Sequence, residues 1–222
     1  MMALDTLAGQ LIDLFATLML LIAFAMIAQR RVLTLIHLFA LQGASLVAST
    51  AVVGYVTHQP HLYISAGLTL ALKVFLIPWL LHRVIDRLSV RWDVETLINI
   101  PTTLILGIVL VIFAFNIAAP IAQLSTSIAR GTLGIALACV LLSFLMMITR
   151  SKAVPQVIGF LAMENGLFFA AVAATYGMPM VVELGIALDV LVAMLILGIF
   201  FFQIRERFDS LDTRHLERLK DQ

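Results

Sequence analysis

The sequence predicts an all-α, polytopic membrane protein of about seven transmembrane helices, with the N-terminus outside and the C-terminus in the cytoplasm. Of its 222 residues, 62% are hydrophobic and 12% are charged, about half the charged fraction of a soluble domain. The mean hydropathy is +1.09. Seven apolar stretches reach the ~20 residues that a helix needs to cross a bilayer. The 14 basic and 13 acidic residues nearly balance, which argues against a nucleic-acid surface, and a single cysteine excludes an internal disulfide.

The predicted spans are separated by joints of three or five residues, except for the 19-residue joint 83–101, and proline or glycine lies near several span ends. The spans are residues 6–28, 32–56, 62–82, 102–122, 128–149, 153–176 and 180–203. Gln29, Arg30 and Arg31 form the very short turn between the first two spans. Pro155 opens the sixth span and Pro179 precedes the seventh, positions at which the missing N–H of proline costs little.

The basic residues predict the orientation, because cytoplasmic loops of membrane proteins carry an excess of Lys and Arg. Twelve of the 14 basic residues lie in the joints after spans one, three and five and in the tail. Of the other two, Arg130 lies in the opposite set of loops and Lys73 lies inside a span. We therefore divide the chain into a transmembrane bundle, residues 1–204, and a cytoplasmic amphipathic tail, residues 205–222. Nothing outside the bilayer is large enough to be a catalytic module.

Three ionisable residues lie near the middle of predicted spans, where a charge costs roughly 2.5–3.5 kcal/mol on insertion scales. Lys73 belongs to the third span, Glu164 to the sixth and Asp189 to the seventh. At about 1.5 Å of rise per residue, all three lie within about one helical turn of the bilayer midplane. Charges at one level on separate helices predict mutual partners, and such groups can pass protons along a relay.

Two further residues are candidates for the entry or exit of such a relay. Glu183 lies one turn into the seventh span, near the outer interface, where it can be solvated. His37 lies one or two turns from the cytoplasmic end of the second span, and a satisfied interior histidine is the alternative interpretation. On the sixth span, an i+4 row of small residues predicts close packing of one face, with Glu164 on the other. That row is Ala162, Gly166, Ala170 and Ala174.

Several chemical signatures are absent from the sequence. It has no phosphate loop, cysteine pair or dinucleotide fingerprint, and no histidine pair midway along a helix for haem. We therefore predict no metal or cofactor site in this chain and do not expect a self-contained redox enzyme.

Three segments are distinctive in combination. Residues 72–78 join Lys73 to a proline, residues 159–166 hold Met-Glu-Asn-Gly, and residues 182–189 place two acids six positions apart. In these segments, and in its number of spans, the chain resembles hydrogenase-4 component E, a membrane subunit of formate hydrogenlyase and related group 4 nickel–iron hydrogenases. The last three spans, residues 128–204, also resemble the small three-helix subunit of complex I. They follow four N-terminal spans, residues 1–127.

The resemblance implies a non-catalytic membrane-arm subunit that couples redox chemistry in partner subunits to proton or sodium movement. Lys73, Glu164 and Asp189 would be relay sites, with Glu183 and His37 as entry or exit groups. The implied partners are antiporter-like and other membrane-arm subunits and the hydrogenase large and small subunits. The nickel–iron centre and iron–sulfur clusters would lie in those partners. The implied location is the cytoplasmic (inner) membrane of the cell.

Three alternatives stay open on the sequence alone. A stand-alone secondary transporter would favour an internal repeat and broken helices at the midplane, and no convincing repeat emerges. A subunit of a multisubunit cation/proton antiporter would share the features of residues 128–204. A purely structural scaffold would use the buried charges only to hold helices together.

Overall fold

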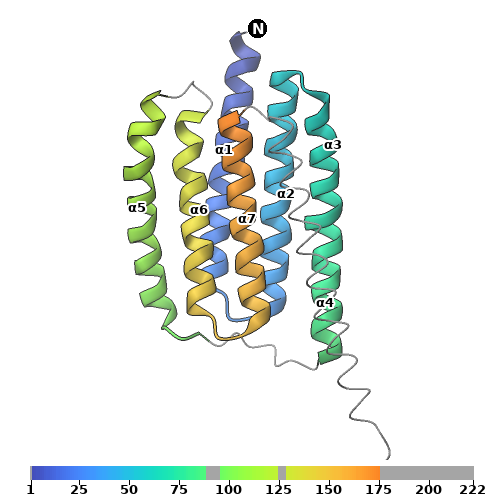
Figure 1. Cartoon of the computed structure of the whole chain (residues 1–222), viewed down its shortest axis with the longest axis vertical. Helices are drawn as coiled ribbons and strands as arrows, with labels where there is room; N and C mark the ends of the chain where they lie inside the picture. The colour runs from blue at the N-terminus through green and yellow to red at the C-terminus, as the bar shows by residue number, and fades with distance from the viewer. Residues whose placement is uncertain (1, 89–95, 125–128, 176–222) are drawn as a thin grey trace, which may run out of the picture.

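The structure, a computed structural model, describes residues 2–88, 96–124 and 129–175, and the regular elements of these ranges are all helices (Figure 1). They are α1 (Met2–Ala28), α2 (Val32–Thr57), α3 (Pro60–Thr69), the π-helix η1 (Leu70–Leu76), α4 (Ile77–Leu88), α5 (Ile100–Leu124), α6 (Ala129–Thr149) and α7 (Ala153–Thr175). α3, η1 and α4 follow one another without a break, so they form one long helix with a π-helical middle.

Within these ranges, six helical segments are long and apolar enough to cross a membrane, so the chain is an all-α, polytopic membrane protein. The segments are Leu7–Ala28, Val32–Thr57, Pro60–Arg83, Ile100–Pro120, Thr132–Thr149 and Ala153–Val172. They agree within a few residues with the first six predicted spans. The predicted seventh span, residues 180–203, and the predicted tail, residues 205–222, lie outside the described residues. The orientation in the membrane stays a prediction.

The predicted turn between the first two spans is confirmed. α1 ends at Ala28, and α2 begins at Val32. The backbone N–H of Gln29 donates to the carbonyl of Met26 at 3.2 Å, which closes the last turn of α1. Arg31 then adopts an extended conformation (φ −110°, ψ 126°) at the N-cap of α2, so the chain changes direction between the two helices.

Four helices form the centre of the bundle. α1 packs against α2 and α6, and α7 packs against the same two helices. In Figure 1, α7 lies in front of α1, between α6 and α2. α5 packs on α6 at one edge, and the α3–η1–α4 helix packs on α2 at the other. The buried residues of α1 recur every three or four positions, the pattern of one helix face turned to its neighbours. They include Ile12, Ala16, Met19, Ala23 and Met26.

The small residues of α7 bring it close to α6, as the sequence predicts. A Cβ added at Gly166 would lie 3.0 Å from Val140 Cγ2, 3.2 Å from the Val140 backbone nitrogen and 3.3 Å from the Ala136 carbonyl oxygen. A Cβ at Gly159, two turns earlier, would lie 2.8 Å from Met147 Cγ. Ala162 between them is buried. Small side chains thus allow the two backbones to approach closely. In a bilayer the lipid is as apolar as the side chains, so helices associate through such close packing and not through the hydrophobic effect.

We expect Gly166→Leu to lower the free energy of unfolding by about 1–3 kcal/mol, because the added side chain meets backbone atoms that cannot rotate away. Thermal unfolding of the full chain in detergent measures the loss. Gly67→Leu is the matched control. A Cβ at Gly67 meets nothing within 4 Å, and the change from glycine to leucine raises the helix propensity equally at both positions. Equal stability of the two variants would contradict close packing at Gly166.

Arg150, which follows α6, is buried and caps the C-terminus of α1. Its Nη2 donates to the carbonyl oxygens of Ile27 at 2.6 Å and of Met26 at 3.3 Å. These carbonyls belong to the last turn of α1, where the helix dipole favours a cation, and the Met26 carbonyl also accepts the N–H of Gln29. Arg150 also forms an isolated antiparallel bridge with Thr96. Burial lowers the pKa of the Arg150 guanidinium from its ordinary value. In the sequence Arg150 is only one of the basic residues that follow the fifth span. Its capping of α1 depends on contacts between segments that are far apart in the sequence.

We expect Arg150→Met to destabilise the chain by about 1.5–3 kcal/mol, because hydrogen bonds from a charged donor to two buried carbonyls are lost. The comparison is Arg30→Met, which removes an exposed cation from the same end of the bundle. Thermal unfolding in detergent should show a large shift for the first variant and little for the second. Equal shifts in the unfolding temperature would mean that the hydrogen bonds of Arg150 to α1 add no more stability than an exposed positive charge does.

Candidate functional site

The structure brings together two of the charges that the sequence places at mid-membrane. Lys73 comes from η1 and Glu164 from α7, and their side chains are 0% and 3% exposed. Lys73 Nζ lies 3.5 Å from Glu164 Oε1. The two residues are 91 positions apart in the sequence, and they become neighbours because η1 and α7 both pack against α2.

A π-helical turn positions Lys73. Pro78 has no N–H to donate, and its ring would collide with the carbonyl one α-turn earlier. The helix widens over Leu70–Leu76, and the N–H of Ile77 reaches back five residues to the carbonyl of Leu72. Within this turn Lys73 is the buried side chain. π-Helices are rare and are frequently found at functional sites.

A glycine of α2 allows η1 to come close. A Cβ added at Gly43 would lie 3.3 Å from Lys73 Cβ and 3.6 Å from Val74 Cγ2. Lys73 Nζ lies 5.8 Å from the centroid of the Phe168 ring on α7, within the range of a cation–π contact. Phe168 follows Glu164 by one helical turn, so the ring and the carboxylate stand on the same face of α7.

Two buried amides accompany the charged pair. Asn165 Nδ2 donates to Gln42 Oε1 at 3.2 Å, which joins α7 to α2. Both side chains are fully buried, and they are the sequence neighbours of Glu164 and Gly43. Gln42 Nε2 and Asn165 Oδ1 have no hydrogen-bond partner among the described residues. We refer to Gln42, Lys73, Glu164 and Asn165 together as the mid-membrane cluster.

Gln42 is a member of the cluster that the sequence pattern does not predict. Its position beside Gly43 is a weak signal, because small residues and hydrogen-bonding side chains are typical of the interfaces between membrane helices. Nothing in the sequence, however, distinguishes it from the other polar residues of that span, because its partner lies on α7, 123 positions further along the chain. Asn165 belongs to the Met-Glu-Asn-Gly segment that carries the family resemblance, but the sequence predicts no contact for it.

His37 lies apart from the mid-membrane cluster. Its side chain is exposed, so the interpretation as an interior histidine is wrong. Its ring stands edge-to-face against that of His82 on α4, with centroids 5.4 Å apart. His82 Nδ1 lies 2.8 Å from the Pro78 carbonyl oxygen, and because a carbonyl only accepts, Nδ1 carries the proton. His37 precedes Gln42, the member of the cluster on α2, by five positions, about 7.5 Å along the helix axis.

The other two predicted relay residues, Asp189 and Glu183, lie outside the described residues. In the described ranges, no three His, Cys, Asp or Glu side chains are grouped so that they could hold a metal ion. The acid of the first span, Asp13, is exposed on α1.

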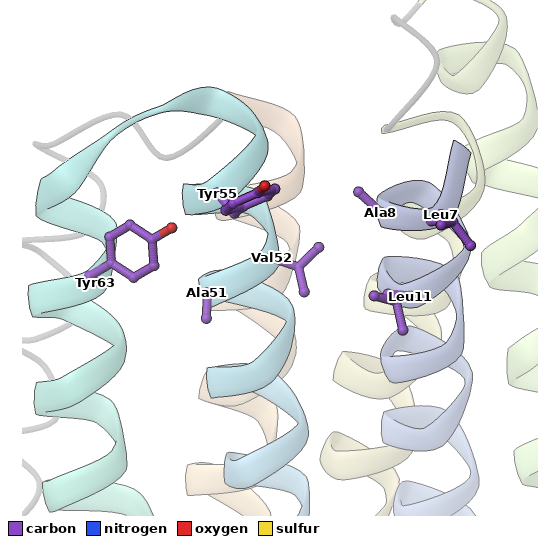
Figure 2. Close-up of a pocket in the computed structure, with 7 residues that line it drawn as sticks. All are labelled: Leu7, Ala8, Leu11, Ala51, Val52, Tyr55 and Tyr63. Atoms are coloured by element: carbon purple, nitrogen blue, oxygen red, sulfur yellow. The ribbon is translucent and has the colours of Figure 1, made fainter. Parts of the chain in front are cut away.

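A cleft of about 470 Å³ opens near the N-terminal end of α1, between α1, α2 and α3. Figure 2 shows its lining residues, Leu7, Ala8, Leu11, Ala51, Val52, Tyr55 and Tyr63. The lining is apolar apart from the two tyrosine hydroxyls, and tyrosine is typical of the membrane–water interface. Ala51, the lining residue of α2 nearest to the cluster, lies nine positions beyond Gln42, about 13.5 Å along α2, so the cleft does not reach the mid-membrane cluster.

Comparisons with known proteins find two groups of relatives. The chain is 32% identical over 213 residues to the uncharacterized protein Rv0085 of Mycobacterium tuberculosis, which covers 95% of this chain and 96% of that protein. It is 22% identical over 182 residues to hydrogenase-4 component E of Escherichia coli, which covers 82% of this chain and 84% of that protein. Hydrogenase-4 component E of Shigella flexneri matches to the same extent. No protein-family model matches the chain. No solved structure matches it.

Proposed function

Because the chain belongs to the same family as Rv0085 of Mycobacterium tuberculosis and is more distantly similar to hydrogenase-4 component E, we propose that it is a membrane subunit of a hydrogenase-type complex. In this role the chain catalyses no redox step itself. It couples electron transfer in partner subunits to the movement of protons or sodium ions across the cytoplasmic membrane. The nickel–iron centre and iron–sulfur clusters belong to those partners, which include hydrogenase and antiporter-like subunits.

The observation that carries the proposal is the buried pair of Lys73 and Glu164. Removing two charges from water costs several kcal/mol each, and replacing a buried ion pair by apolar residues is often neutral or stabilising. Stability therefore gives little reason for a charged pair between apolar helices. Ionisable groups at this depth commonly mark ion pathways and proton relays.

The geometry also fits transfer between the two groups. The distance of 3.5 Å between Nζ and Oε1 is slightly longer than a strong hydrogen bond, so a small approach of the side chains makes or breaks contact. Gln42 and Asn165, which adjoin Gly43 and Glu164 in the sequence, offer a buried donor and a buried acceptor on the same helices. We propose Asp189 as the next member of the relay, and Glu183 and His37 as groups near its two ends.

Purification of the tagged chain from its native host in mild detergent tests the proposal. The expected result is co-purification of large polytopic subunits and of subunits that carry iron–sulfur clusters, with nickel and iron in the preparation. A metal-free preparation that contains only this chain, and that transports an ion after reconstitution in liposomes, would overturn it in favour of a stand-alone transporter.

A further inference from the structure

Two histidines from different helices meet at one end of the bundle. His37 lies in the second turn of α2 and His82 in the second turn of α4. Their ring centroids are 5.4 Å apart, with an angle of 69° between the ring planes. His37 is exposed and His82 is half-buried. The two residues are 45 positions apart, so the sequence shows no metal-binding spacing for them.

The hydrogen bond of His82 prepares its other nitrogen as a ligand. Nδ1 donates its proton to the Pro78 carbonyl oxygen at 2.8 Å, so the neutral imidazole carries its lone pair on Nε2. A hydrogen bond from one ring nitrogen to a backbone carbonyl is a common arrangement around metal-binding histidines, because it fixes the tautomer and the orientation of the ring.

The separation of the two rings fits one shared metal ion. Zinc–nitrogen bonds are about 2.0–2.1 Å long, which puts each ring centroid about 3.2 Å from the ion. At the tetrahedral angle, two centroids at that distance are about 5.2 Å apart, close to the observed 5.4 Å. The helix backbones therefore need not move. Rotation of the exposed His37 ring, whose terminal torsion has broad minima, can turn one of its nitrogens toward the ion.

The pair lies at a level that ions can reach from water. Trp79 is exposed on α4, and the Arg83 guanidinium lies 5.0 Å from the centroid of its ring. Tryptophan and basic side chains at the end of a membrane helix are typical of the membrane–water interface. His82 directly precedes Arg83, so the histidine pair lies at the level of this interface.

From this geometry we propose that His37 and His82 form a binding site for a divalent transition-metal ion such as Zn²⁺. Imidazole nitrogens are suitable ligands for Zn²⁺, Cu²⁺ and Ni²⁺. The pair supplies two ligands and water completes the coordination, since no group of three His, Cys, Asp or Glu side chains that could hold an ion occurs in the described part of the chain. The bound ion joins α2 to α4. The site does not depend on the proposed function.

Equilibrium binding of Zn²⁺ to the purified full-length chain in detergent, without a histidine tag, tests the proposal. We expect saturable binding to the wild type. His37→Gln and His82→Asn should each weaken this binding by at least about tenfold, the lower limit for loss of a single second-shell partner. In His82→Asn the side-chain amide can still donate to the Pro78 carbonyl, while the Nε2 ligand is lost.

His58→Gln is the matched control. His58 is also an exposed histidine, but it lies at the opposite end of α2, just after Thr57. The control variant should bind Zn²⁺ as the wild type does. Absence of saturable binding to the wild type would overturn the proposal. Binding that persists in either His37→Gln or His82→Asn would overturn it as well, because a shared ion needs both rings.

Thermal unfolding checks that the variants fold. Without metal, all of them should unfold near the wild-type temperature, and Zn²⁺ should raise that temperature only where the site is intact, because it binds the folded state. Electron paramagnetic resonance of Cu²⁺ keeps the test independent of variants at His37 and His82. In the chain with His58→Gln and His61→Gln, splitting by two imidazole nitrogens is expected. Splitting by one nitrogen, or by none, would overturn the paired site.

Discussion

Glu164→Gln is expected to lower ion translocation by the proposed complex by roughly 100-fold, the lower range for loss of a proton-transferring group. Glutamine has nearly the shape of glutamate and keeps an oxygen toward Lys73, but it cannot accept the proton at Oε1. The redox activity of the complex is expected to continue without ion movement. Vesicle acidification per mole of assembled complex is the measurement.

Asp13→Asn is the matched control for this variant. Asp13 is also an acid within a membrane span, but its side chain is exposed on α1. Neutralising it should leave translocation near the wild-type rate. Unchanged translocation in fully assembled Glu164→Gln complex would mean that the buried charges serve only as a scaffold.

The second large effect concerns stability. Lys73→Met is expected to lower the free energy of unfolding by about 3–5 kcal/mol, because it leaves the Glu164 carboxylate buried without the ammonium that compensates it. The double variant Lys73→Met with Glu164→Met is expected to recover most of this loss, since two apolar side chains can fill the same volume. Thermal unfolding of the purified chain in detergent compares the single variants, the double variant and the wild type.

The double variant separates two roles of the pair. A scaffold needs only a well-packed core, so a stable and assembled double variant would retain coupling. A relay needs groups that exchange protons, so the same variant would assemble and lose ion translocation. Failure of the double variant to recover stability would instead show that the packing around these two positions requires the charged side chains.

The transmembrane architecture follows largely from the sequence. The length of an apolar stretch is a local property, and comparison with the thickness of a bilayer predicts six spans close to those of the structure. Charges inside such stretches are equally conspicuous, so Lys73 and Glu164 stand out in the sequence itself. Their common depth follows from counting residues along each span, and their contact agrees with it.

Only the tertiary structure decides which faces of the helices meet. In a bilayer, lipid chains are as apolar as leucine, so hydrophobicity does not distinguish a lipid-facing side from a buried one. The exposed isoleucines and phenylalanines of α5 and the buried residues of α1 look alike in the sequence. The pairing of Gln42 with Asn165 and the burial of Arg150 against α1 depend on atoms brought together from distant segments. Close approach at glycines and polar contacts between helices select one arrangement, because these interactions have direction where the hydrophobic effect has none.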